Sequence, residues 1–373
     1  MNNLFVLGEK DLIKLAIMML LAAIAFGLTG LVMMIILQWM TRQNYAKDSV
    51  DKHGISSVSA SRLGGAAVAL STVILLVIGE FAGLGHTVLA PRELQLIAWI
   101  AVIVCLGLGL VEDLRNNSLT PRFRLLVEFV VFAVLVAVMP ILIPIDLGVW
   151  SLDAIMALPV IGWLLTSIFC VGFINAVNMA DGANGLMPGI LTISFGLFYA
   201  ETGVYSYACL MTSCGLFTIF NVISGRLFLG DAGAYGLGAA LCVSGLFLFG
   251  QGDFSASFLA VLLAYPCIDM LVSLSRRVAQ GRSLFLPDND HLHNRIHFQL
   301  QKRFRSATLA NSLTGGSIVM ATSGIALLGY QLEWLAVTSQ LWSVVFGCQC
   351  LVYALVFYLT GLGRSVSQYV VDA

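Results

Sequence analysis

Long apolar runs recur along almost the whole chain, and they limit its fold more than any other feature. A bilayer offers no water to bond the backbone, so a run of about 20 apolar residues crosses it only as a helix. Of the 373 residues, 59% are hydrophobic and 10% are charged, and the mean hydropathy is +0.94. The sequence therefore predicts an all-α, polytopic integral membrane protein. We expect eleven transmembrane helices, at 12–40, 63–85, 95–111, 125–145, 155–177, 186–200, 204–223, 235–250, 256–274, 308–330 and 334–360.

Basic residues favour one side of these spans. If the loop after the first span is cytoplasmic, 16 of the 19 Lys and Arg residues lie in cytoplasmic segments. Because cytoplasmic loops carry an excess of Lys and Arg, this arrangement predicts a cytoplasmic C-terminus. The span at 12–40 is too long for a signal-peptide core, so we expect it to stay in the protein. We expect a single transmembrane domain over residues 1–373, with the large basic loop 275–307 on the cytoplasmic side.

The sequence also excludes several classes of site. All eight cysteines fall in apolar segments without a Cys-x-x-Cys pair, so we interpret them as small packing residues. Neither a phosphate-binding Gly-x-x-x-x-Gly-Lys loop nor a dinucleotide-binding glycine motif is present, so an ATPase or a dehydrogenase has no support. We expect no nucleic-acid partner.

Two acidic motifs lie at predicted cytoplasmic helix ends. Glu112 and Asp113 are adjacent, and neighbouring carboxylates repel each other unless a cation or an arginine such as Arg124 holds them together. Asp231 lies between small residues just before an apolar run, where Gly230 lets a ligand approach the backbone. The alternatives are a solvated helix end for the first motif and a helix N-cap for the second.

A third motif places polar residues at the end of an otherwise apolar helix. Asn175, Asn178 and Asp181 are spaced three apart and share one helix face. A carboxylate within a membrane helix costs roughly 2.5–3.5 kcal/mol, so such groups usually bind something. The alternative is that these residues cap the helix and begin a loop.

A fourth motif lies in the loop 275–307. His291, His293 and Arg295 alternate there with other residues, a pattern that suits a phosphate or a diphosphate. Zinc is less favoured because a His-x-His pair lacks clear third and fourth ligands. A histidine-rich surface loop is the remaining alternative. Carboxylates together with His and Arg on one membrane face favour Mg²⁺, or Mn²⁺ in its place, and a nucleotide diphosphate, since Mg²⁺ binds carboxylate and phosphate oxygens.

Together these motifs resemble the polyprenyl-phosphate N-acetylhexosamine-1-phosphate transferases, and the resemblance runs from about residue 53 to residue 297. It is closest to the bacterial branch that uses undecaprenyl phosphate and N-acetylglucosamine. Its carriers are Arg62-Leu-Gly-Gly65, Glu112-Asp113, Asn175-Ala-Val-Asn178-Met-Ala-Asp181-Gly, Phe228-Leu-Gly-Asp231-Ala-Gly and Asp288-Asn-Asp-His291-Leu-His293.

The resemblance implies a reaction and a location. Undecaprenyl phosphate would attack the β-phosphate of a UDP-N-acetylhexosamine, release UMP and start a lipid-linked surface glycan such as a lipopolysaccharide O-antigen. The enzyme would lie in a bacterial inner membrane, in contact with membrane lipid, with its active site on the cytoplasmic side; a homodimer stays open.

The resemblance also implies roles for individual residues. Glu112, Asp113, Asp181 and Asp231 would be catalytic, and Asp231, Asp113 and Asn178 would hold the metal. The residues expected to bind substrate are Asn175, Asn178, Arg62, Arg124, His291, His293 and Arg295.

Two positions depart from the family pattern. Glu112 stands where the family usually has an aspartate, and Asn184 replaces the second acid of Asp-Gly-x-Asp-Gly. These changes leave open a catalytically impaired homologue that acts as a binding partner. A secondary transporter is a further alternative, with Asp181, Asp231 and Asp269 as ion or substrate sites.

Overall fold

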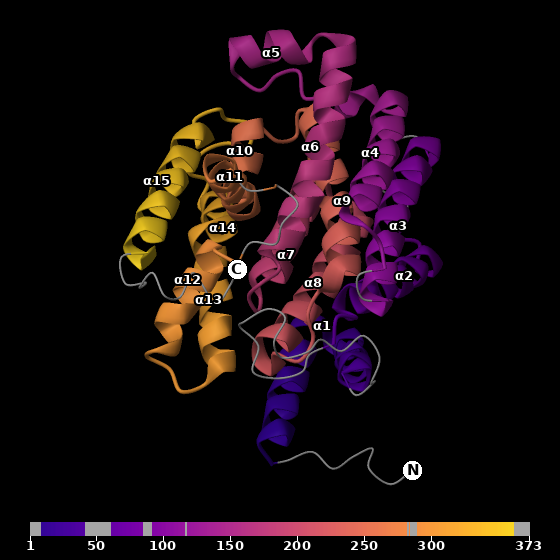
Figure 1. The fold of residues 1–373 in the computed structure, drawn as a ribbon. Coiled ribbons are helices and arrows are strands. Elements are labelled where there is room, and N and C mark those ends of the chain that lie inside the picture. The colour runs from indigo at the N-terminus through magenta and orange to yellow at the C-terminus, as the bar shows by residue number, and fades with distance from the viewer. Residues whose placement is uncertain are drawn as a thin grey trace.

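The computed structural model describes residues 9–41, 61–84, 92–115, 118–281, 283 and 289–361. Long helices lie side by side in a bundle, and the short helix α5 lies across one end of it (Figure 1). The helices are α1 (Glu9–Met40), α2 (Gly64–Phe81), α3 (Arg92–Leu114), α4 (Pro121–Val138), η1 (Pro140–Leu142), α5 (Trp150–Met156), α6 (Pro159–Ala180), α7 (Leu186–Thr202), α8 (Tyr205–Ser224), α9 (Gly230–Gln251), α10 (Ala256–Leu262), α11 (Ala264–Ala279), α12 (Leu292–Gln301), α13 (Ala307–Ala321), α14 (Ser323–Gln331) and α15 (Trp342–Gly361).

The described part of the chain confirms a helical, multi-pass membrane protein but not eleven spans. Seven helices are long and apolar enough to cross a membrane, or up to nine spans if each of two bent helix pairs counts as one. The helix α7 has 17 residues, about 25 Å at 1.5 Å per residue, which is shorter than a hydrocarbon core of about 30 Å. The helix α4 carries Arg122, Arg124 and Glu128 within 18 residues. The sidedness predicted for the C-terminus concerns residues 362–373, which lie outside the described ranges.

The helix α9 forms the centre of the bundle, and most of its residues are buried. Glycines let neighbouring helices approach it closely. A Cβ atom on Gly65 would lie 2.0 Å from the Gly233 nitrogen, and one on Gly109 would lie 2.2 Å from the Asp231 carbonyl oxygen. Because there is no room for a side chain at these two positions, the ends of α2 and α3 are held against the first turn of α9.

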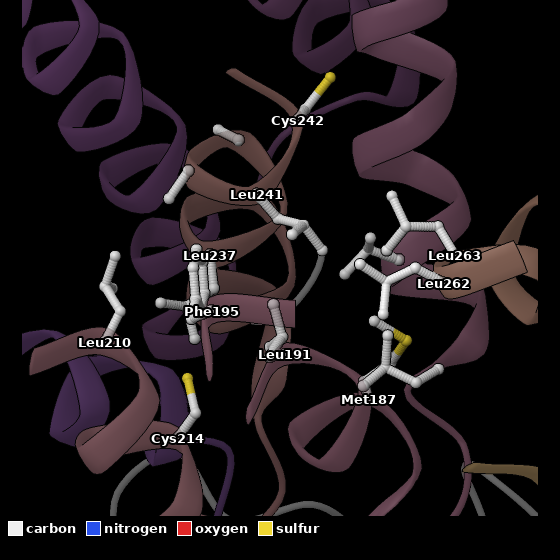
Figure 2. Close-up of a cluster of buried hydrophobic side chains, with 14 of the residues drawn as sticks. Met187, Leu191, Phe195, Leu210, Cys214, Leu237, Leu241, Cys242, Leu262 and Leu263 are labelled. Carbon is white, nitrogen blue, oxygen red and sulfur yellow. The ribbon is translucent and has the colours of Figure 1, made fainter. Parts of the chain in front are cut away.

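Apolar side chains from α7, α8, α9 and α10 meet in the interior (Figure 2). Phe195 and Leu241 are fully buried there, next to Cys214 and Cys242. All eight cysteines are free, and five of them are buried. For those five, the interpretation as small packing residues is confirmed.

Both bent pairs are broken inside the bundle. The helices α10 and α11 meet at 81°, and α13 and α14 meet at 48°. Pro266 lacks the N–H that would bond the Leu262 carbonyl, and that carbonyl instead accepts the Ser323 hydroxyl at 2.6 Å. Gln349 of α15 donates to carbonyls at both breaks, including Val261 and Thr322. Side chains of other helices therefore bond the backbone carbonyls that the bends leave without helical partners, as a membrane interior requires.

Candidate active site

Acidic residues from three separate helices meet where α3 and α6 end and α9 begins. Asp113, at the end of α3, accepts hydrogen bonds from two backbone N–H groups of α9: Asp231 N–H to Oδ1 at 3.0 Å and Ala232 N–H to Oδ2 at 2.8 Å. Gly230 has a φ of 72°, and a Cβ atom there would lie 2.2 Å from the Arg62 carbonyl oxygen. Asp113 thus caps α9 from another helix and fixes the position of Asp231.

Asp181 completes this group, and we call Glu112, Asp113, Asp181 and Asp231 the acidic cluster. Asp181 follows the last turn of α6 and accepts a hydrogen bond from the Gly230 N–H. Burial of its carboxyl group raises the pKa of Asp181 well above its usual range, and the charges of Asp113 and Asp231 act in the same direction. The hydrogen bond from Gly230 opposes this shift. Burial and the neighbouring carboxylates therefore both favour the neutral form of Asp181.

Glu112 lies at the edge of the acidic cluster. It is 5% exposed, and its Oε2 accepts the Leu119 N–H at 3.1 Å. Its charge also acts on Asp231. The longer side chain thus bonds the segment between α3 and α4, a contact that the sequence did not predict.

Two arginines face the acidic cluster from different parts of the chain. Residues 61–65 lie alongside residues 226–229, joined by backbone bonds such as Phe228 N–H to the Ser61 carbonyl at 2.8 Å, and this pairing places Arg62. Arg62 and Arg124 both act electrostatically on Asp231. Both arginines thus lie within electrostatic range of the acidic cluster, and their predicted role in binding substrate stays a prediction.

Tyr235 was missed by the sequence argument. Its hydroxyl accepts hydrogen bonds from Arg124 Nη1 and from Asn178 Nδ2, both at 3.1 Å. Tyr235 lies four residues after Asp231 and therefore on the same face of α9, a spacing that could have identified it. It joins α4, α6 and α9 around the cluster.

Asn175 bonds another acid. Its Nδ2 donates to Glu128 Oε2 at 2.8 Å and to the Val171 carbonyl. Glu128 is fully buried in α4 and acts electrostatically on Asp231. The structure thus brings Asn178 directly to the acidic cluster and connects Asn175 with it only through Glu128.

The histidine motif forms a second group, which we call the histidine cluster: Tyr265, Asp269, His291, His293 and Tyr353. His291 Nδ1 lies 2.6 Å from Asp269 Oδ2, and His293 Nδ1 lies 2.7 Å from the Tyr265 hydroxyl. Tyr353 donates to Asp269 Oδ1 at 2.7 Å. Burial lowers the pKa of His293 to about 3, helped by His291 and His297 and opposed by Asp269, so His293 is neutral at ordinary pH.

Arg295 is held outside the histidine cluster. Its Nε and Nη2 donate to the two carboxylate oxygens of Asp290 at 2.7 and 2.6 Å, and its Nη1 donates to the Phe357 carbonyl. Its guanidinium carbon lies 3.5 Å from the centre of the Phe357 ring. Asp288 of the same motif lies outside the described residues. These contacts anchor α12 against α15.

The acidic and histidine clusters meet at Gly182. A Cβ atom on Gly182 would lie 2.0 Å from His293 Nε2, and Gly182 directly follows Asp181. The His293 ring therefore packs against the turn that carries Asp181. The predicted site residues other than Asn175 and Arg295 thus lie in or beside two clusters that touch at Gly182.

The acidic cluster suits a hard cation by its chemistry. Carboxylate oxygens are the donors that Mg²⁺ prefers, and Asp113, Asp181 and Asp231 repel one another at close range. Among the described residues, however, no three His, Cys, Asp or Glu side chains are arranged to hold a metal on their own. A cation here would therefore need ligands from substrate or water in addition, as Mg²⁺ commonly does.

Comparisons with known proteins match this region. Residues 95–249 match the family described as "Glycosyl transferase family 4", and this range contains the whole acidic cluster together with Arg124, Asn178 and Tyr235. Arg62 and the histidine cluster lie outside the matched range.

Several curated proteins are similar to the chain. One is a phospho-N-acetylmuramoyl-pentapeptide-transferase of Levilactobacillus brevis, 24% identical over 63% of this chain and 78% of that protein. Another is a probable undecaprenyl-phosphate N-acetylglucosaminyl 1-phosphate transferase of Bacillus subtilis, 24% identical over 63% of this chain and 65% of that protein. A decaprenyl-phosphate N-acetylglucosaminephosphotransferase of Mycobacterium tuberculosis is 28% identical over 53% of this chain and 55% of that protein.

Proposed function

We propose that the chain is a glycosyl transferase family 4 enzyme that transfers a sugar 1-phosphate to a polyprenyl phosphate, because residues 95–249 match that family and similar proteins carry the names of such enzymes. We further propose that it uses UDP-N-acetylglucosamine and undecaprenyl phosphate. The products are undecaprenyl-diphosphate-linked N-acetylglucosamine and UMP. The observation that carries this proposal is the acidic cluster with Arg62 and Arg124 at one end of the bundle. The product would start a lipid-linked surface glycan, and we propose that this glycan is a lipopolysaccharide O-antigen.

The proposed reaction joins two anions. An oxygen of the lipid phosphate forms a bond to the β-phosphorus, and the bond from that phosphorus to the oxygen shared with the α-phosphate breaks, so that UMP leaves with the electron pair. A phosphate monoester has a second pKa near 6, so the attacking phosphate is mostly dianionic at neutral pH. Catalysis of such a transfer consists mainly of positioning and charge stabilisation.

The residues divide these tasks by their placement. Arg62 and Arg124 supply the fixed positive charge beside Asp231, and Tyr235 orients both Arg124 and Asn178. Asp231, Asp113 and Asn178 would hold Mg²⁺ or Mn²⁺, with Asp181 beside them. When bound, the cation would neutralise the diphosphate and allow the anionic lipid to approach.

The membrane fold supports a lipid substrate and a membrane location. The outer faces of several helices expose apolar residues, including Val130 and Val134 of α4. A polyprenyl chain can therefore stay in the bilayer while its phosphate reaches the acidic cluster. We propose one transferase domain, with this cluster on the cytoplasmic side of a bacterial inner membrane. A reporter enzyme that works only in the cytoplasm should therefore be active when it is fused to the C-terminus. A homodimer remains a prediction.

The second candidate donor is a UDP-N-acetylmuramoyl-pentapeptide, because a similar protein carries that sugar in its name. We favour N-acetylglucosamine because of the His-Leu-His form of the motif at 291–293. The donor test below includes both nucleotides, so it distinguishes them directly.

Two positions motivated the impaired-homologue alternative, and Asn184 has a structural explanation. The Asn184 N–H donates to Asn311 Oδ1 at 2.9 Å, and its side-chain amide lies 3.4 Å from the Ser312 hydroxyl. Asn184 is 2% exposed and ties the turn after α6 to α13. Its amide is used in packing, which weakens the argument that the missing charge impairs catalysis.

The transport alternative placed ion or substrate sites at Asp181, Asp231 and Asp269, of which Asp269 lies furthest inside a predicted span. Its Oδ2 lies 2.6 Å from His291 Nδ1, and its Oδ1 accepts from the Leu292 N–H and the Tyr353 hydroxyl. Three protein donors bond the Asp269 carboxylate, one more than bond that of Asp113, so we assign Asp269 to the histidine cluster. We therefore retain the transferase.

The deciding experiment is a transfer assay with purified protein in detergent. Undecaprenyl phosphate, Mg²⁺ and radiolabelled UDP-N-acetylglucosamine should give label in the lipid phase and an equal amount of UMP, and EDTA should abolish both. Mn²⁺ should restore transfer after EDTA. As a control variant, Asp153→Asn should transfer as well as the wild type. Asp153 accepts a hydrogen bond from the Leu147 N–H and lies in α5, far from the acidic cluster in the chain. Transfer only from the muramoyl-pentapeptide nucleotide would change the sugar, and no transfer from any donor by folded protein would refute the proposal.

A further inference from the structure

One face of the helix α11 carries the side chains that bond both histidines of the motif. Tyr265 and Asp269 are four residues apart on α11 and therefore neighbours on its surface. Both are buried, at 1% and 2% exposure. Tyr265 bonds His293 Nδ1 at 2.7 Å and Asp269 bonds His291 Nδ1 at 2.6 Å. A side chain of α11 thus bonds each imidazole at its Nδ1 atom.

The bonds around Asp269 determine where His291 carries a proton. Asp269 Oδ1 accepts the Leu292 N–H at 3.0 Å and the Tyr353 hydroxyl at 2.7 Å, and Oδ2 is left for His291. An ionised carboxylate can only accept hydrogen bonds. His291 must therefore carry hydrogen on Nδ1, which makes Nε2 the nitrogen that can accept or release a proton.

The two parallel imidazole rings link Asp269 and Tyr265 to the acidic cluster. His291 and His293 are parallel, with ring centres 5.4 Å apart and an angle of 3° between planes. His293 Nε2 lies against Gly182, the residue after Asp181. His291 is therefore one ring away from the turn that carries Asp181, and a shift of Asp269 would change the position of His291 relative to that turn.

We propose that Asp269 is a positioning residue for sugar-phosphate transfer: it fixes His291 in the form with hydrogen on Nδ1 and directs Nε2 to the diphosphate of the nucleotide sugar. Arg295, which the sequence placed at the substrate, instead pairs with Asp290 and stacks on Phe357. Asp269 and α15 thus hold α12 from two sides. This inference rests on the proposed function for its catalytic part, and its structural part is measured separately below.

Asp269→Asn tests the proposal because it preserves shape and reverses one hydrogen bond. The amide oxygen can take the place of Oδ1 and keep the bonds to Leu292 and Tyr353. The amide NH₂ then faces His291 Nδ1 as a donor, so Nδ1 must lose its hydrogen and Nε2 must gain one. A wrong tautomer of this kind costs up to about 10⁴-fold in a well-studied hydrolase triad.

The first measurement is independent of activity. In protein labelled with ¹⁵N-histidine, His291, assigned through a His291→Gln variant, should show a protonated Nδ1 in the wild type and an unprotonated Nδ1 in Asp269→Asn. An unprotonated Nδ1 in the wild type would overturn the proposal whether or not the protein transfers sugar phosphate. The same holds if Asp269→Asn fails to fold, because the wild-type spectrum still decides.

The second measurement is kinetic. Asp269→Asn should lower kcat about 100-fold, while KM for the nucleotide sugar changes by less than about threefold. Asp269→Glu keeps the charge and should recover at least a tenth of wild-type kcat. Tyr353→Phe removes a bond to Asp269 but leaves His291 its partner, so it should lower the melting temperature and keep Nδ1 protonated.

Two kinetic outcomes would contradict the positioning role. One is an Asp269→Asn enzyme with kcat within about threefold of the wild type. The other is an equal loss in Tyr353→Phe, which would show that Asp269 only stabilises the fold. If the wild type transfers no sugar phosphate at all, the proposed function fails, while the Nδ1 measurement still tests the structural part.

Discussion

The acidic cluster and the histidine cluster meet at Gly182, yet they treat charge in opposite ways. In the histidine cluster, Asp269 bonds three donors at 2.6 to 3.0 Å. In the acidic cluster, four carboxylates from different parts of the chain face two arginines, and Asp181 is pushed toward its neutral form. The first group is complete as it stands, whereas the second gains stability from a cation or from the ligands that accompany one.

This difference divides the expected work between them. A group with satisfied hydrogen bonds can orient a substrate without rearranging, which is the main source of electrostatic catalysis. A group with excess negative charge binds a cation tightly but is less stable without it. We therefore expect substitutions in the acidic cluster to remove metal dependence and substitutions in the histidine cluster to change orientation.

The largest effect is expected from Asp231→Asn. It removes the charge that Arg62, Arg124 and Asn178 all face, so Mg²⁺-dependent transfer should fall by about 10³-fold or more. The protein should still insert and fold, because the substitution relieves repulsion between carboxylates. Activity should be measured from 0.1 to 50 times the wild-type Mg²⁺ requirement, to separate weak binding from lost chemistry. Normal turnover would remove the metal assignment and with it the contrast between the clusters.

Asp113 should differ from Asp231 because it serves both structure and charge. Asp113→Ala leaves the buried N–H groups of Asp231 and Ala232 without acceptors, which should cost about 2 kcal/mol or more in stability. Asp113→Asn keeps one acceptor and should lose less. Thermal unfolding in detergent measures both variants. Equal melting temperatures for the Ala variant and the wild type would show that Asp113 does not cap α9 in the folded protein.

Tyr235→Phe sharpens the comparison inside the acidic cluster. The variant loses the hydroxyl that bonds Arg124 and Asn178 but keeps the ring. We expect kcat/KM for transfer to fall about 10-fold, since two orienting bonds of about 1 kcal/mol each are lost and partly replaced by water. Tyr207→Phe, in α8, is the matched control. An unchanged kcat/KM would mean that Arg124 and Asn178 are oriented without Tyr235.

The sequence predicted the helical membrane fold and the convergence of the acids because both depend on strong local signals. Apolar runs identify membrane helices, and charges inside them are rare enough to stand out. Eleven spans were not confirmed among the described residues because α7 is short and α4 carries three charges in its first half. Tyr265 and Tyr353 could not be found by that signal, since a tyrosine in an apolar run is ordinary. Only the packing of helices distant in sequence gives their hydroxyl groups partners, whereas Tyr235 could have been found from its spacing to Asp231.

The histidine cluster gives a smaller, pH-dependent effect. Burial lowers the pKa of His293 to about 3 from 6.5, so the folded protein binds fewer protons than the unfolded chain between these values. Stability should therefore be complete above pH 6.5 and fall as the pH drops toward 3. His293→Gln cannot titrate, and its melting temperature should fall less steeply on acidification than that of the wild type. Identical slopes would show that His293 is not held neutral.

The smallest effect is expected from Glu112→Asp, which restores the acid usual in the family. The shorter side chain loses its reach to the Leu119 N–H, a part-buried bond whose loss should cost about 1 kcal/mol. Transfer should stay within about threefold of the wild type or increase, because a cluster completed by a cation can adjust to a carboxylate one methylene shorter. The assay is kcat at saturating Mg²⁺, with Glu201→Asp, in the last turn of α7, as the control. Complete loss would mean that the acidic cluster is tuned to the longer acid as strictly as the histidine cluster is tuned to its partners, and the contrast between the two would no longer hold.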